Sequence, residues 1–92
     1  MSNLDKIKLK LGISHTAKDA AIMADMDTAR EEMIRAGVHP DIATSDDKLV
    51  VRAVETYVLM EYSDPELRER YENAFETQVN NLRKSESRWG DV

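Results

Sequence analysis

The side chains that could carry chemistry are few in this sequence and stand far apart. The chain has no cysteine and two histidines, His15 and His39, each in or beside an expected loop. A structural zinc site takes about four converging ligands, and no further histidine or cysteine is present to complete one. We therefore interpret both histidines as solvent-accessible loop residues and predict neither a metal site nor a cofactor.

Carboxylate pairs and isolated hydroxyl groups do not indicate an active site either. The acidic pairs are Glu31-Glu32 and Asp46-Asp47. Adjacent side chains on a helix point about 100° apart, so neither pair converges on one substrate atom. Ser14-His15 lacks a third group at a spacing that would orient the histidine, and the three glycines are too isolated to form a phosphate-binding loop. The sequence predicts a protein that is not an enzyme.

Charge is distributed unevenly along the chain. The net charge is −5, and residues 1–40 are neutral, so the whole excess lies in residues 41–92. A protein that grips nucleic acid through its phosphates needs the opposite sign. A helix-turn-helix domain is disfavoured for the same reason, because the helix expected after residue 45 opens with Asp46-Asp47. We interpret the acidic half as solvated helix faces and a surface that repels DNA.

Length and hydropathy favour one small domain. The chain has 92 residues, of which 41% are hydrophobic. No apolar run approaches the ~20 residues that span a bilayer, and the first residues do not resemble a signal peptide. We therefore expect a single domain without membrane association.

Apolar periodicity in the first half predicts two helices. A short helix follows from leucine and isoleucine at helical spacing over residues 4–11, and Gly12 is placed to end it. Thr16 is the expected N-cap of a long helix over residues 17–36, with Asp19 in the position of a capping box. The methionine-containing stripe of this helix is expected in the core, although methionines also suit an adaptable binding surface.

The second half predicts a loop, two further helices and a tail. Residues 38–45 are expected to form a loop with room for one helical turn, and Ser45 is the expected N-cap of the next helix. This third helix should be central in the core, with an apolar face made of Leu49, Val50, Ala53, Val54, Tyr57 and Val58. Ser63-Asp64-Pro65-Glu66 predicts the start of a fourth helix. Its expected inner face comprises Leu67, Tyr71, Ala74, Phe75, Gln78 and Leu82.

The predicted fold is therefore all-α. It is a small bundle of about four helices over residues 1–84, with a short N-terminal helix, followed by a flexible C-terminal tail at residues 85–92. A domain this small is only modestly stable alone, so association with other copies or with a partner would stabilise it.

The order and patterning of these helices have a parallel in a known family. The similar segments are Lys10-Leu11-Gly12-Ile13, Ala36-Gly37, the valine-rich run from Leu49 to Val58, Tyr62-Ser63-Asp64-Pro65, and Tyr71-Glu72-Asn73-Ala74-Phe75 before Leu82-Arg83. Over about residues 3–84 the chain resembles the small head–tail connector proteins of long-tailed bacteriophages and prophages. These proteins are also called adaptor or head-completion proteins.

The resemblance implies a structural virion protein at the head–tail interface, assembled in the cytoplasm of the bacterial host. It implies a ring of about a dozen copies beneath the portal protein, which extends the DNA channel and receives a tail or stopper protein. DNA would pass through this ring without specific binding. By their charge, the candidates for the channel lining are Asp46, Asp47, Glu69 and Glu76. The family also docks a C-terminal segment onto the portal, which makes Arg88 and Trp89 candidate contacts in a tail that is short for the family.

Two alternatives stay open. The chain could be a small helical regulatory or protein-binding module of a bacterial host, such as an antitoxin-like or adaptor domain. Trp89, the only tryptophan, could equally dock back onto its own domain. Gene order separates the two functions, because a connector gene lies between capsid and tail genes and a regulator lies beside its own target.

Overall fold

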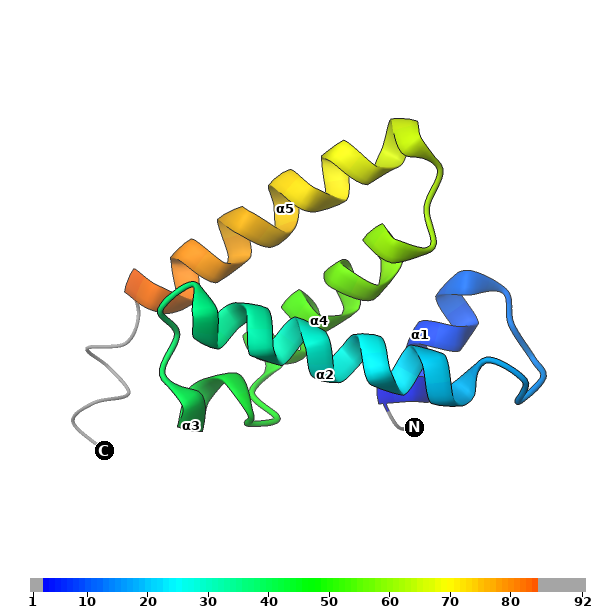
Figure 1. The fold of residues 1–92 in the computed structure, drawn as a ribbon, viewed down its shortest axis with the longest axis horizontal. Helices are drawn as coiled ribbons and strands as arrows, with labels where there is room; N and C mark the ends of the chain where they lie inside the picture. Colours follow the sequence, from blue (N-terminus) through cyan, green and yellow to red (C-terminus); the bar gives the residue numbers. More distant parts are fainter. Residues whose placement is uncertain (1–2, 85–92) are drawn as a thin grey trace.

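Five α-helices make up the described part of the molecule, which is residues 3–84 of the computed structural model (Figure 1). In chain order they are α1 (Asn3–Leu11), α2 (Asp19–Arg35), α3 (Pro40–Ala43), α4 (Lys48–Glu61) and α5 (Pro65–Lys84). Residues 3–84 contain no strand, and none of their helices is long and apolar enough to cross a membrane. The predicted all-α bundle is therefore confirmed, with the short helix α3 in addition to the four expected helices.

α3 is a single helical turn inside residues 38–45, the predicted loop with room for one such turn. Pro40 occupies its first position, where the missing N–H removes no helical hydrogen bond. The Asp41 backbone N–H donates a hydrogen bond to Nδ1 of His39 at 3.1 Å, which caps the turn. Ile42 and Ala43 are buried in the main core. The turn thus anchors the connection between α2 and α4 to the rest of the bundle.

α4 is the central element of the core, as its hydrophobicity predicted. It packs against α5, α2 and α1, and Val50, Val54 and Val58 are almost completely buried. The main core lies among α2, α3, α4 and α5. A smaller cluster, in which Ile7 and Ile22 meet Val58, fixes α1 against α2 and α4. Both clusters include α4, so this helix connects the two ends of the bundle.

α2 begins at Asp19, later than the predicted start at residue 17. The prediction of Thr16 as N-cap was wrong, because Lys18 precedes the helix and makes no side-chain cap. The Asp19 carboxylate instead contacts α1, with Oδ1 2.7 Å from Nζ of Lys8. Apart from this ion pair, that buried oxygen has no hydrogen-bond partner among the described residues. The carboxylate expected in a capping box therefore joins two helices.

α4 likewise begins later than predicted, and Ser45 is not its N-cap. The cap is Asp47, whose carboxylate accepts a hydrogen bond from the Leu49 N–H at 2.9 Å. Ser45 follows the C-cap of α3, and its hydroxyl donates to the Ile42 carbonyl at 2.7 Å. A capping side chain must reach the second or third N–H of the helix. Asp47 immediately precedes α4 and meets that condition, whereas Ser45 lies too far upstream.

The N-terminal half of α5 projects from the bundle. Its first turns form an outer edge of the molecule (Figure 1), and among residues 65–73 Tyr71 alone is partly buried while the others are exposed. Leu67, predicted on the inner face, is 40% exposed. Leu49, in the first turn of α4, was also predicted inside and is 47% exposed. The buried face of α5 is concentrated in its C-terminal half, at Val79 and Leu82.

Candidate partner-binding surfaces

Side chains suited to metal binding are not brought together within residues 3–84. No group of three or more histidine, aspartate or glutamate residues in that range could hold a metal ion. His15 lies in the exposed α1–α2 connection and accepts a hydrogen bond from the Ala17 N–H at 3.3 Å. His39 caps α3, with Nδ1 3.8 Å from a carboxylate oxygen of Asp41. Each histidine therefore has a local contact in its own connection.

A groove lies between α2, α4 and α5, and we call it the acidic groove. Its volume is about 420 Å³. Its apolar lining comprises Ala36, which is exposed at the end of α2, and a more buried floor made of Tyr57, Met60, Phe75 and Val79. Polar side chains at its border are Glu32, Glu72, Glu76 and Asn80. Aromatic rings surrounded by carboxylates suit a ligand that is apolar at its centre and cationic at its edge.

The floor of the acidic groove is held by an aromatic contact. The rings of Tyr57 and Phe75 lie 5.2 Å apart and are tilted by 60°, a favourable arrangement for two aromatic side chains. Burial raises the pKa of Tyr57, and the nearby carboxylates of Glu61 and Glu32 raise it further. The Tyr57 phenol therefore stays neutral at physiological pH, and the negative charge of the groove comes from its carboxylates.

A second hollow lies between α1 and the first half of α4, and we call it the cationic hollow. It measures about 450 Å³ and is bordered by four basic side chains: Lys6, Lys10, Lys48 and Arg52. Two carboxylates, Glu55 and Asp46, also border it. Nζ of Lys10 lies 3.0 Å from a carboxylate oxygen of Glu55. Leu9, on the same short helix, is 71% exposed, so an apolar side chain lies beside these cations.

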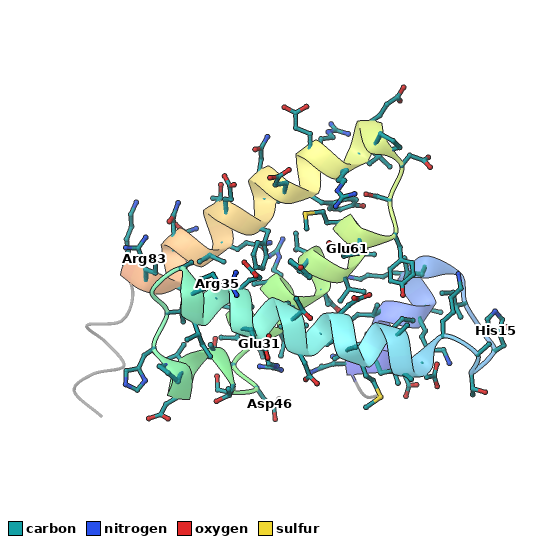
Figure 2. The ribbon with its side chains drawn as sticks, in the orientation of Figure 1. His15, Glu31, Arg35, Asp46, Glu61 and Arg83 are labelled. Atoms are coloured by element: carbon teal, nitrogen blue, oxygen red, sulfur yellow. The ribbon has the colours of Figure 1, made fainter. Side chains whose placement is uncertain are left out.

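The acidic groove and the cationic hollow lie on opposite faces of α4. Residues of an α-helix are about 100° apart, so Tyr57 and Met60 point to one side and Arg52 and Glu55 to the other. Figure 2 shows Asp46, one of the residues that border the cationic hollow, on the side of α2 away from α5. One molecule can therefore use both surfaces at once.

The four candidates for a channel lining do not share one surface. Asp47 caps α4, and the Asp46 side chain is 93% exposed, with its carboxylate 3.9 Å from the Arg30 guanidinium. Glu69 and Glu76 lie about two turns apart on one side of α5, both exposed. They belong to a stripe of four exposed glutamates, Glu66, Glu69, Glu72 and Glu76. Their spacing of three or four residues was the signal that could have revealed the whole stripe.

Arg30 is a structural residue that the sequence did not reveal. Its Nη1 donates hydrogen bonds to the carbonyls of Ala43 at 2.9 Å and Ser45 at 2.8 Å. Its side chain is largely buried, so α2 holds the connection between α3 and α4. The partners are far away along the chain and are backbone atoms, so no local spacing of residue types predicts them.

Arg88 and Trp89, the candidate portal contacts, lie outside the described residues. Comparisons of the chain with protein-family models, curated proteins and solved structures gave no match in any of the three. The surfaces described above are therefore the basis for a functional proposal, together with the helix pattern.

Proposed function

We propose that this chain is a structural subunit of the head–tail connector of a long-tailed bacteriophage or prophage. The observation that carries the proposal is the order and length of the helices. A short α1 of 9 residues, a long α2 of 17, a hydrophobic α4 of 14 and a long α5 of 20 follow one another with short connections. This is the pattern on which the family resemblance of residues 3–84 rests.

A connector subunit needs a surface for the copy on each side of it in the ring. Such a ring repeats one contact between two different surfaces of the same chain. The acidic groove and the cationic hollow supply two surfaces of opposite charge on opposite faces of α4. In the proposed ring of about a dozen copies, each subunit sits beneath the portal protein and offers its far side to a tail or stopper protein.

The channel of the proposed ring passes DNA without specific binding. Carboxylates on its wall keep phosphates from adhering, and the acidic stripe of α5 offers such a surface. Within that stripe, Glu69 lies on the projecting half of α5, outside the acidic groove. Asp46 is the other strongly exposed candidate. Asp47 is engaged as a cap and contributes mainly to the start of α4.

Electron microscopy of the chain mixed with its portal protein tests this function. We expect an added ring beneath the portal, extending the channel. A folded sample that does not associate with the portal at any salt concentration would rule out the connector function. A monomeric chain in the absence of portal would be compatible with it, because the portal can template the ring.

A second experiment isolates the proposed role of the C-terminal segment in the virion. The matched variant ends at Lys84 and so lacks Arg88 and Trp89 while keeping all five described helices. We expect this variant to lose most of its portal binding, and Trp89→Ala to weaken binding in the same direction. Unchanged binding of both variants would remove the segment from the interface but leave the ring itself in place.

The acidic groove also favours a second candidate function, a protein-binding module of a bacterial host. An aromatic floor with a carboxylate border suits a basic amphipathic segment of a partner protein. Gene order tests this alternative directly. A position between capsid and tail genes supports the connector, and a position beside a gene for a basic partner supports the binding module.

A further inference from the structure

The two charged surfaces differ in shape as well as in sign. The acidic groove is concave, and its floor carries Tyr57 and Phe75. The outer side of α1 is a convex helix surface on which Lys6, Leu9 and Lys10 are neighbours, because residues three and four apart share a helix face. The groove therefore offers apolar surface inside a negative border, and α1 offers an apolar side chain with Lys6 beside it on the same face.

Leu9 is the feature of α1 that its own domain does not explain. The inner side of α1 is used by Ile7, which is fully buried, and by Lys8, which pairs with Asp19. Leu9 points the other way and has the largest exposed fraction among the exposed large hydrophobic residues of the described chain, 71%. A leucine at this position gains from burial only if another molecule or another segment covers it.

We propose that copies of this chain associate head to tail, with Leu9 and Lys6 on α1 of one copy seated in the acidic groove of the next. Leu9 contacts the Tyr57–Phe75 floor, and Lys6 approaches Glu72 and Glu76. The inference deepens the proposed connector function and rests on it for the closure of the contacts into a ring. The contact itself follows from the complementary charge and shape of the two surfaces.

The geometry of α4 permits this contact to repeat. α1 packs on α4 beside the cationic hollow, and the acidic groove lies on the opposite face of α4. A subunit can therefore insert its α1 into one neighbour while it receives the α1 of another, as a heterologous ring requires. Glu76 is thereby assigned to the subunit interface, and Glu69 remains available to the channel.

Cross-linking between two differently tagged copies tests the contact. The natural chain has no cysteine, so Leu9→Cys in one copy and Glu72→Cys in the other introduce the only thiols. We expect a short bismaleimide to join this pair at least about tenfold faster than the control pair, because contact raises the effective concentration of the two thiols. The control pair is Leu9→Cys with Leu49→Cys, whose second site is exposed but outside the groove.

Charge reversal gives an independent test of the same contact. Lys6→Glu with Lys10→Glu makes α1 acidic, and Glu72→Lys with Glu76→Lys makes the groove basic. Each double variant alone is expected to lose most of its association between copies, measured by cross-linking or sedimentation. An equimolar mixture of the two variants is expected to recover that association. If Lys10→Glu disturbs the fold through Glu55, Lys6→Glu with Leu9→Asp replaces it, since both side chains are exposed.

The possible results separate this contact from the connector function. Equal rates for the test and control pairs, or faster reaction of Glu72→Cys with Trp89→Cys than with Leu9→Cys, would overturn the proposal. The second result would assign the groove to the C-terminal segment. A ring seen on the portal without the Leu9–Glu72 cross-link would preserve the connector function and reject this interface. The cross-link without portal binding would preserve this interface and reject the connector function.

Discussion

Two regions of the molecule are held in place by different forces. One is the junction where α2, α3 and α4 meet, and the other is the first half of α5. At the junction, Met33, Ala43 and Val50 are completely buried, and Arg30 donates hydrogen bonds to two backbone carbonyls. In residues 65–73 of α5, Tyr71 alone is partly buried and the other residues are exposed. The first region is fixed by tertiary packing, whereas the second depends on helical hydrogen bonds, with little burial to support it.

This difference separates residues that maintain the fold from residues that are free to meet a partner. A helix with little tertiary packing is only marginally stable in water, and a domain of this size buries a limited fraction of its surface. The projecting half of α5 and the outer side of α1 are therefore where an assembly would add most stability.

The largest expected effect comes from removing core volume at the junction. Met33→Ala leaves a cavity in the main core and should lower the free energy of unfolding by about 3 kcal/mol. Leu67→Ala, on the projecting half of α5, removes a similar side chain that is already 40% exposed and should cost less than about 1 kcal/mol. Urea denaturation followed by circular dichroism measures both. Equal costs would mean that the first half of α5 is as firmly packed as the junction.

The next largest loss of stability is expected at Arg30, and Arg68 on α5 is its matched control. Arg30→Ala removes the donor for the Ala43 and Ser45 carbonyls and should cost about 2 kcal/mol, because hydrogen bonds from a charged group are strong. Arg68→Ala on α5 breaks an ion pair with Glu61 whose atoms are 3.9 Å apart, on exposed side chains, and should change stability by less than about 0.5 kcal/mol. The same denaturation experiment checks them. A smaller cost for Arg30 than for Arg68 would contradict the role of Arg30 in holding the connection.

The sequence predicted the class of the fold and the central place of α4, because those depend on hydrophobic periodicity. The prediction that Leu67 lies on the inner face was wrong. A sequence pattern shows which face of a helix is apolar, but it does not show how far along the helix the neighbouring helices cover that face. The sequence missed Arg30, whose acceptors are backbone atoms brought close by α3. The acidic groove and the cationic hollow arise where α1, α2 and α5 meet different faces of α4. Their members come from separate helices, and only the glutamate stripe of α5 was visible as a local spacing.

A smaller loss of stability is expected when alanine replaces Gly12 or Gly37, the glycines that follow α1 and α2. Both have positive φ, +107° at Gly37 and +72° at Gly12, so alanine is strained at each. A Cβ at Gly37 would lie 3.1 Å from Nε of Arg83 on the last turn of α5, whereas a Cβ at Gly12 meets nothing within 4 Å. We expect Gly12→Ala to cost about 1 kcal/mol from backbone strain alone. Gly37→Ala should cost more, because the Arg83 side chain must also move, and thermal denaturation of both variants measures the difference. Equal costs would mean that Arg83 moves aside without loss of stability.

The smallest expected effect is a pH dependence at Tyr57, where α4 meets the buried half of α5. Burial and the carboxylates of Glu61 and Glu32 raise the pKa of Tyr57 above its usual value of 10.0. Because the folded state favours the neutral phenol, its contribution to stability is complete below about pH 10 and is lost as the pH rises through the folded-state pKa. Tyr57→Phe should therefore lose less stability than the natural chain between about pH 9 and about pH 11. Chemical denaturation at both pH values measures the difference. The same dependence of stability on pH in both proteins would mean that folding does not raise the pKa of Tyr57, against the burial of its ring beside Phe75.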